Sequence, residues 1–411
     1  MDEQNMEKQS ADPTQIRRGT IPVMAVACGV MVGNIYLCQP LLGAIAKDFG
    51  VPDSIASLVA VMTQVGYALG ILLLVPLSDM AEPRSLVRWM SALAAVGLLM
   101  ACLAPAIPVL LAASIFLAFV TVVPQVLIPL ATSLVAPEHR GRAVGSLATG
   151  LIMGILLSRT ISGLVAGYGG SWRASYGLAS VLSVIVFFLV PAFMPKKSEH
   201  ATSIGYFKLL ASLPPLLKHR DLILSMAMNF LVFGAFSAFW ATMAFHLATP
   251  EFSLGPAAAG LFGLWGAPGA LLAPMAGRLS DRWGPARVNV LGFASVLICF
   301  AIAITIGAHS LIALVIVVNL LDFGLQSGQV ANQTRIFAIA PEIRGRLNTL
   351  YMVSTFGGGA IGALAGGYAW SAAGWTGVCL LGFVATCLAA IILATGVATA
   401  TSSKQGHRSE P

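Results

Sequence analysis

Two ionisable side chains, Arg159 and Asp322, stand inside long apolar stretches of this sequence. The aspartate belongs to a polar stripe whose members are three or four residues apart, and a helix would place such a stripe on one face. The stripe consists of Asn319, Asp322, Gln326 and Gln329. A carboxylate on this stripe could load and release a proton, and its change of charge could free Arg159 or a bound solute. The candidate chemistry is therefore reversible proton binding.

A charge deep in hydrocarbon costs at least about 2.5–3.5 kcal/mol, so each of the two groups needs something to offset it. Counting residues along two helices puts them roughly 8 Å apart along the membrane normal, a gap that an arginine could bridge if both face one cavity. Two alternatives involve no function: a fixed ion pair, or an arginine bonded to backbone carbonyls beside Gly154 and Gly163. The repeat copy of Arg159 is Ala363.

The composition indicates what surrounds the elements that carry these residues. The chain is 57% hydrophobic and only 9% charged, and its mean hydropathy is +0.87. A water-soluble core is enclosed by a polar shell, for which this sequence has too few charged residues. The sequence therefore predicts an all-α membrane protein.

Apolar runs of about 18 or more residues recur along the chain, each long enough to cross the hydrocarbon as a helix. We predict twelve spans, and internal Gly and Pro are tolerated in them because neighbouring helices satisfy the freed backbone groups. The predicted spans are 20–46, 55–77, 86–104, 107–135, 143–166, 173–193, 222–247, 256–277, 288–307, 310–334, 347–370 and 375–396.

The chain also repeats itself. Residues 137–142 read Pro-Glu-His-Arg-Gly-Arg, and residues 341–346 read Pro-Glu-Ile-Arg-Gly-Arg. Gly154 and Gly163 recur at the same offset as Gly358 and Gly367. The repeat predicts two six-helix bundles that could rock against each other around a central site. The predicted parts are a cytoplasmic amino-terminal tail (1–19), a bundle (20–193), a cytoplasmic linker (194–221), a second bundle (222–396) and a cytoplasmic carboxyl-terminal tail (397–411).

The basic residues predict the orientation. With both termini in the cytoplasm, all of the 23 Lys and Arg except Lys47, Arg159 and Arg173 fall on the cytoplasmic side. The net charge of +7 then needs no nucleic-acid partner, because topology accounts for the excess and anionic lipid is the expected neighbour.

Several chemistries have no motif in the chain. The sequence contains no G-x-x-x-x-G-K-[ST] loop for a nucleotide, no H-E-x-x-H and no G-x-S-x-G, so neither a nucleotide-driven motor nor a common hydrolase is expected. The six cysteines all fall in predicted spans without metal-ligand spacing. We expect no enzyme, no metal and no cofactor, and an ion gradient, most simply of protons, as the energy source.

One loop resembles a known family. Residues 277–284, Gly-Arg-Leu-Ser-Asp-Arg-Trp-Gly, followed by Arg287, are similar to a cytoplasmic loop of the major facilitator superfamily. Residues 33–36 and 39–42 in the first span resemble the opening helix of a bacterial branch grouped with the drug/proton antiporters. The resemblance implies a twelve-helix transporter fold in a bacterial inner membrane.

It also implies a cytoplasmic gate, in which loop aspartates cap helix starts and pair with arginines when the cavity opens outward. The alternative is that these charges are solvated topology determinants. The predicted gate residues are Asp79, Arg84, Glu138, Arg142, Asp281, Arg282, Arg287, Glu342 and Arg346.

A substrate cavity should appear as polar side chains and aromatic walls within the spans, because lipid-facing polar groups are costly. The predicted lining residues are Asn34, Tyr36, Gln39, Gln64, Tyr67, Gln125, Arg159, Asn229, Trp240, Trp265, Asn319, Asp322 and Gln326.

Three functions remain open from the sequence. The first is proton-coupled export of small amphipathic compounds or metabolites, by a chain that we expect to be monomeric. The second is import or exchange of an anionic metabolite, with Arg159 as the partner of the anion. The third is a receptor or scaffold that uses the same fold without transport.

Overall fold

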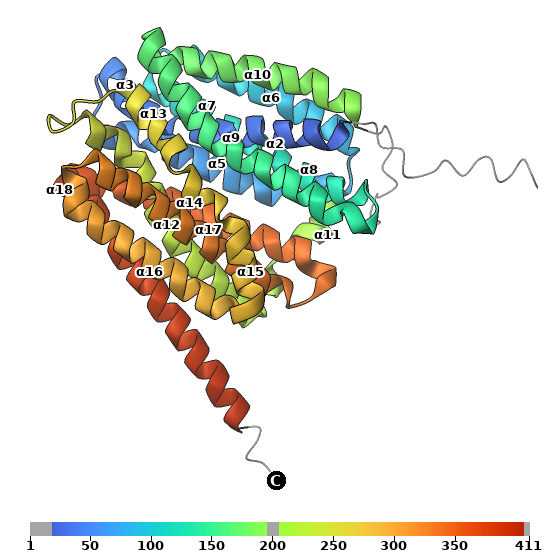
Figure 1. Ribbon diagram of the computed structural model, residues 1–411. Coiled ribbons are helices and arrows are strands. Elements are labelled where there is room, and N and C mark those ends of the chain that lie inside the picture. Colours follow the sequence, from blue (N-terminus) through green and yellow to red (C-terminus); the bar gives the residue numbers. More distant parts are fainter. Residues whose placement is uncertain (1–18, 195–204, 407–411) are drawn as a thin grey trace, which may run out of the picture.

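The protein is nearly all helical in the residues that the computed structural model describes, 19–194 and 205–406, and these contain no strand (Figure 1). This confirms the prediction of an all-α membrane protein. Within these two ranges, eleven helical segments are long and apolar enough to span a membrane, and the last of them, residues 344–396, is long enough for two crossings.

The amino-terminal half supplies six spans, four of which are interrupted or extended by short helices. A break at Leu37 and Cys38 divides the first span, and one at Thr121 and Val122 divides the fourth. The elements are α2 Thr20–Tyr36, η2 Gln39–Leu41, α3 Leu42–Phe49, α4 Asp53–Ala56, α5 Leu58–Leu74, η3 Pro76–Asp79, α6 Pro83–Cys102, α7 Ile107–Val120, α8 Val123–Ser133, η4 Pro137–His139, α9 Arg140–Gly169 and α10 Trp172–Phe193.

The carboxyl-terminal half repeats this plan. Its second span, which is the eighth of the chain, is broken into three helices. The elements are α11 Tyr206–Ala211, η5 Pro214–Lys218, α12 Arg220–Ala248, α13 Pro256–Trp265, α14 Ala267–Leu271, α15 Ala273–Trp283, α16 Pro285–Ile304, η6 Ile306–Ala308, α17 Leu311–Phe337, η7 Pro341–Ile343 and α18 Arg344–Gly406.

Helix α18 holds the last two predicted spans. Its backbone leaves the helical region at Ala373 and Gly374, where φ is −144° and +59°. The positive φ at Gly374 is costly for residues with a Cβ, so this glycine permits the turn between two crossings. With it, the predicted twelve spans are all present. The helix continues beyond 396, the predicted end of the last span, and its final part projects from the bundle in Figure 1.

The predicted tails and part of the linker, residues 1–18, 195–204 and 407–411, lie outside the described residues. The described part of the linker forms α11 and η5, and Tyr206 in α11 donates from its hydroxyl to the Leu73 carbonyl oxygen at 2.9 Å.

The repeated glycines mark equivalent helix contacts in the two halves. A Cβ at Gly154 on α9 would lie 2.2 Å from the Gly29 carbonyl oxygen on α2, and one at Gly358 on α18 would lie 2.3 Å from that of Phe230 on α12. Such close backbone approach is typical of small residues in membrane helices. The first and fifth spans therefore pack as the seventh and eleventh do.

The two halves meet along two helix pairs, α9 with α13 and α5 with α18. The second pair of repeated glycines lies at these contacts. A Cβ at Gly163 would meet the Pro256 carbonyl oxygen, and one at Gly367 would meet the Ser57 hydroxyl. Figure 1 shows the blue-to-green half beside the yellow-to-red half, in contact along one side of each. The candidate site lies between them.

Candidate functional site

Arg159 on α9 lies at the centre of the contact between the halves and is 1% exposed. Its Nε donates to Gln39 Oε1 at 2.7 Å. Its guanidinium carbon lies 3.9 Å from the ring centroid of Trp240, 5.1 Å from that of Tyr36 and 5.6 Å from that of Phe236. Three aromatic faces and one amide oxygen therefore surround the cation, and they come from both halves.

Two donors in this cluster lack partners. Arg159 Nη2 and Trp240 Nε1 are buried and make no hydrogen bond within the described residues. Aromatic faces stabilise a cation, but they do not replace the hydrogen bonds that water would give to its N–H groups. The cluster is therefore incomplete as a purely structural site.

Asp322 on α17 is 6% exposed, and its Oδ2 also has no hydrogen-bond partner among the described groups. The structure forms no ion pair between Asp322 and Arg159. Arg159 donates to the Gln39 side chain instead. This conformation therefore shows neither the fixed ion pair nor the arginine bonded to backbone carbonyls that a non-functional role would predict.

Glycines on the broken eighth span bring the two charged residues to neighbouring positions. A Cβ at Gly263 would lie 2.9 Å from Arg159 Cβ, and a Cβ at Gly266 would lie 2.5 Å from Asp322 Oδ2. Positions three residues apart are neighbours on a helix surface. Arg159, from the first half, and Asp322, from the second, thus contact the same stretch of the chain.

The break in the eighth span has its own polar support. Asn319 Oδ1 accepts from Gly269 N at 2.9 Å, and Asn319 Nδ2 donates to the Trp265 and Val315 carbonyl oxygens at 2.8 Å each. The bonds to Gly269 N and to the Trp265 carbonyl oxygen satisfy backbone groups that the break between α13 and α14 leaves free. Asn319 is therefore committed to the backbone and not presented to a solute.

Three other polar side chains on α17, two from the stripe and Asn332 beyond it, differ in burial. Gln326 and Gln329 are half-buried, whereas Asn332 is buried and accepts from Asn289 Nδ2 at 3.1 Å and from Arg335 at 3.2 Å. The stripe therefore runs from Asp322 toward the predicted cytoplasmic end through half-buried amides.

The predicted lining residues of the amino-terminal half divide into two groups. Gln64 and Tyr67 on α5 are buried at the contact between the halves, with Gln64 Oε1 unpaired and the Tyr67 ring 4.4 Å from that of Phe356. Gln125 approaches Tyr67 from α8 and is half-buried. Asn34 instead donates to the Ser183 hydroxyl at 3.3 Å inside its own bundle.

Two predicted residues of the second half also lie apart from the Arg159 cluster. Asn229 donates to the Thr355 hydroxyl at 2.7 Å between α12 and α18. The Trp265 side chain is 41% exposed and packs on Phe262, with ring centroids 5.0 Å apart. The structure thus gathers Tyr36, Gln39, Arg159 and Trp240, with Asp322 beside them, and leaves these two outside.

The two halves are closed at the predicted outer face. Trp370 Nε1 on α18 donates to Asp53 Oδ2 on α4 at 2.9 Å, and the Thr160 hydroxyl on α9 donates to the Gly260 carbonyl oxygen at 3.1 Å. The outer halves of the spans make these contacts, which extend inward to Tyr67 and Phe356. A solute at the centre is therefore sealed from this face.

The predicted gate at the opposite face is not engaged. Glu138, Arg142, Asp281, Arg282, Arg287 and Glu342 are exposed, Arg84 and Arg346 are half-buried, and none of these residues forms an ion pair in the described structure. Asp79 ends η3, and its side chain lies outside the described part. A gate that latches the outward-open state should be released when the outer face is closed, as it is here. This conformation therefore does not test the gate, and its role stays a prediction.

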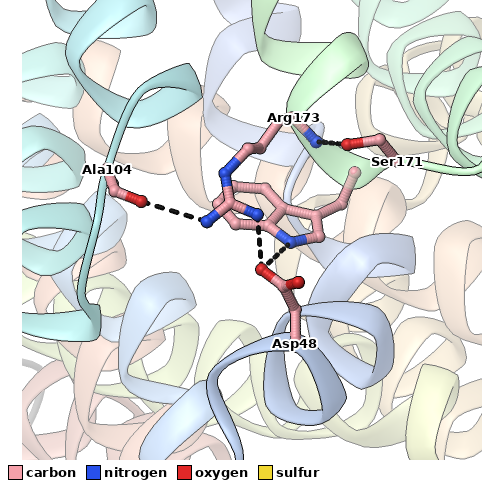
Figure 2. A network of polar contacts seen from close by, with 5 residues as sticks. Asp48, Ala104, Ser171 and Arg173 are labelled. Atoms are coloured by element: carbon pink, nitrogen blue, oxygen red, sulfur yellow. Dashed lines mark hydrogen bonds and ion pairs between the residues drawn. The ribbon is translucent and has the colours of Figure 1, made fainter.

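A network at the predicted outer end fixes the amino-terminal bundle (Figure 2). Asp48 on α3 accepts from Trp172 Nε1 at 3.1 Å and pairs with Arg173, both at the start of α10. Arg173 Nη2 also donates to the Ala104 carbonyl oxygen at 3.1 Å, between α6 and α7. Three separate segments are tied together, which favours movement of this half as one body.

Sequence reasoning missed several contributors. Gly263 and Gly266 admit the two charged side chains, and Phe236 completes the aromatic wall around Arg159. Phe236 lies four residues before Trp240, a helical spacing that could have suggested it. Arg335 was also missed, although its Nη1 donates to the Ser225 hydroxyl at 3.3 Å and links α17 to α12.

The six cysteines are free, and the described residues contain no cluster of His, Cys, Asp and Glu that could hold a metal ion. The prediction of no metal is not tested by this, and it stays a prediction.

The Trp370–Asp53 bond gives a testable result. Trp370→Phe removes the donor and keeps the ring, so the outer face should open more often. A hydrogen bond of about 1 kcal/mol corresponds to a roughly fivefold shift in that equilibrium. The measurement is labelling of Ser57→Cys by a membrane-impermeant maleimide, with the native cysteines replaced by alanine. An unchanged labelling rate would show that the bond does not hold the face closed, and Trp375→Phe is the control.

Comparison with known proteins is consistent with this architecture. A family model described as Major Facilitator Superfamily matches residues 24–263 and 222–410. The uncharacterized transporter YgaY of Escherichia coli is 39% identical over 364 residues, covering 88% of this chain and 91% of that protein. Among solved structures, a mutant of the nucleoside transporter NupG has a TM-score of 0.72 at 14% identity, over 92% of this chain and 98% of NupG. A bacterial homologue of the human lysosomal transporter Spinster, in an inward-facing and unoccupied conformation, has a TM-score of 0.68 at 14% identity, over 93% and 96%.

Proposed function

Because the chain belongs to the Major Facilitator Superfamily and is a multi-pass membrane transporter, we propose that it carries a small solute by alternating access, driven by a proton that Asp322 binds and releases. The two halves rock around the Arg159 cluster. They close at the predicted outer face in this conformation and at the predicted cytoplasmic face in the other. No nucleotide or redox cofactor takes part in the cycle.

The observation that carries this proposal is the pair of buried, unpaired groups. Asp322 Oδ2 and Arg159 Nη2 come from different halves, contact neighbouring positions of the eighth span, and lack partners within the described residues. Protonation relieves the cost of a buried carboxylate, and deprotonation restores its attraction for a cation. If the burial of Asp322 changes when the halves move, its affinity for a proton changes as well. Proton binding is thereby coupled to that movement.

Export of amphipathic compounds or metabolites is the direction that we propose. The aromatic walls around Arg159, formed by Tyr36, Phe236 and Trp240, suit a solute with an apolar body. The resemblance of residues 33–42 to drug/proton antiporters supports the outward direction. In that cycle the proton enters from outside, at the face that is closed in this conformation, in a bacterial inner membrane with both termini in the cytoplasm.

A second candidate function has an observation in its favour. Arg159 Nη2 and Trp240 Nε1 are both buried donors without acceptors, an arrangement that suits an anion. Proton-coupled import or exchange of an anionic metabolite would use the same cluster and the same Asp322. In proton-coupled import, the solute and the proton would move in the same direction.

Proteoliposomes that contain a pH-sensitive dye and a preset pH gradient test both functions. Organic acids, amphipathic cations and sugars are added in turn, and the direction of proton movement is recorded. We expect a subset of the solutes to move protons. For export, the solute should flow outward while protons flow inward. Solutes that raise the melting temperature of the purified protein without moving any proton would contradict the proposed proton coupling.

A further inference from the structure

A hollow of about 630 Å³, lined by both charged and apolar side chains, lies at one end of the amino-terminal bundle, away from the contact between the halves. It is formed where the start of α6 meets the last third of α10. Its lining residues are Glu82, Arg84, Ser85, Arg88, Trp89, Ala92 and Phe187. The hollow shares no residue with the Arg159 cluster.

The chemistry of the hollow suits an anion. Arg84 and Arg88 are four residues apart on α6, so their side chains leave the same face of the helix. Arg88 lies over the Phe187 ring, with 5.1 Å between the guanidinium carbon and the ring centroid, and neither arginine forms an ion pair in the described structure. Glu82 is a single opposing carboxylate, and it is exposed. Two guanidinium groups outweigh it, and they match the oxygens of a phosphate.

The surroundings of the hollow suit an apolar tail on that anion. Helices α6 and α10 pack on each other and on α2, α7, α8 and α9 of their own half. Their outward faces carry large exposed apolar side chains: Leu93, Val96, Leu99 and Met100 on α6, and Val181, Val184, Ile185 and Phe188 on α10. This apolar surface begins at the hollow and runs toward the other end of both helices. It is the face of the bundle that lipid covers.

Trp89 marks the depth of the hollow. Its side chain is 67% exposed and lies in the lining beside Arg88. Tryptophan is enriched at the level of lipid head groups, where its ring meets the acyl chains and its N–H remains wet. The hollow therefore lies at the head-group level, on the predicted cytoplasmic side.

We propose that this hollow binds the phosphate of an anionic glycerophospholipid between Arg84 and Arg88, with the acyl chains lying on the exposed apolar face of α6 and α10. Phe187 holds the Arg88 side chain over the site, and Trp89 packs against the glycerol region. The lipid binds to the lipid-facing surface of the transporter, and it is distinct from the transported solute.

The test is native mass spectrometry of the full chain, released from nanodiscs that contain phosphatidylcholine and phosphatidylglycerol. We expect the wild-type protein to retain one phosphatidylglycerol more firmly than any phosphatidylcholine. Arg84→Gln/Arg88→Gln should weaken that binding by about thirtyfold. The matched control is Arg278→Gln/Arg282→Gln, an exposed pair with the same spacing on α15. It should bind phosphatidylglycerol as the wild type does.

A fluorescence measurement keeps the proposal testable if the double variant folds poorly. Phospholipids brominated near the head group should quench Trp89, and the difference in quenching between wild type and Trp89→Phe should be larger with phosphatidylglycerol than with phosphatidylcholine. Equal quenching by both lipids would overturn the proposal. So would equal loss of bound lipid in the control pair, or displacement of the lipid by millimolar inorganic phosphate, which would show a free-phosphate site instead.

Discussion

Replacing Asp322 with asparagine is expected to lower proton-coupled transport by about a hundredfold or more while the protein still inserts and folds. Asparagine has nearly the same shape but cannot exchange a proton. The wild-type carboxylate already lacks a hydrogen-bond partner at Oδ2, so no existing bond within the described structure is lost there. The measurement is the ratio of solute flux to proton flux in proteoliposomes, with size-exclusion chromatography to check folding.

The control is Asp221→Asn, which makes the same chemical change at an exposed aspartate at the start of α12. It should leave the coupling ratio unchanged. If Asp322→Asn retained full coupling, the proton would have to bind elsewhere. The cycle proposed for this carboxylate would then be wrong.

Arg159→Met should also reduce transport by about a hundredfold, for a different reason. Methionine fills much of the volume between the rings of Tyr36 and Trp240 but carries no charge. Deprotonated Asp322 then has no cation to attract it, so the carrier should stall after the proton is released. Measured proton uptake in the absence of solute should persist, which separates this variant from Asp322→Asn.

Stability should respond differently from transport. A buried cation without an ion pair is costly, and replacement of buried charges by apolar residues of similar volume is often neutral or stabilising. We therefore expect the melting temperature of Arg159→Met to equal or exceed that of the wild type. Arg159→Lys keeps the charge but loses the planar contact with the rings, and should raise KM more than it lowers kcat. A strongly lowered melting temperature for Arg159→Met would indicate a structural role.

Much of the fold could be predicted from the sequence because two signals were strong. Apolar length fixed the number of spans, and the repeat fixed their grouping. Gly154 and Gly358 proved to be equivalent contacts inside the two halves, and Gly163 and Gly367 proved to be contacts between them. A glycine kept at the same offset in two copies indicates close backbone approach at both places.

The site was only partly predictable, because helical spacing reports the face of a residue but not its neighbour. Asn319 and Asp322 lie on one face of α17, yet the first bonds the broken eighth span while the second is unpaired. The break itself depends on how Gly266 packs, which spacing does not reveal. For the same reason Asn34 was expected in the cavity but donates to Ser183 within its own bundle.

The central claim is that the protonation state of Asp322 sets the balance between the two conformations, and this can be measured without knowing the solute. Spin labels at Gly141→Cys and Gly345→Cys occupy equivalent positions of the repeat, with open space around each. They report the separation of the halves at the predicted cytoplasmic face by electron–electron double resonance. The native cysteines are replaced by alanine in this background.

Protonation relieves the cost of burying Asp322, so acid should favour the conformation described here, with long distances between the labels. Alkaline pH should shift the population to short distances as the outer face opens. Asp322→Asn should show one distribution at every pH. A distribution that is independent of pH in the wild type, or equally dependent on pH in Asp322→Asn, would contradict the claim.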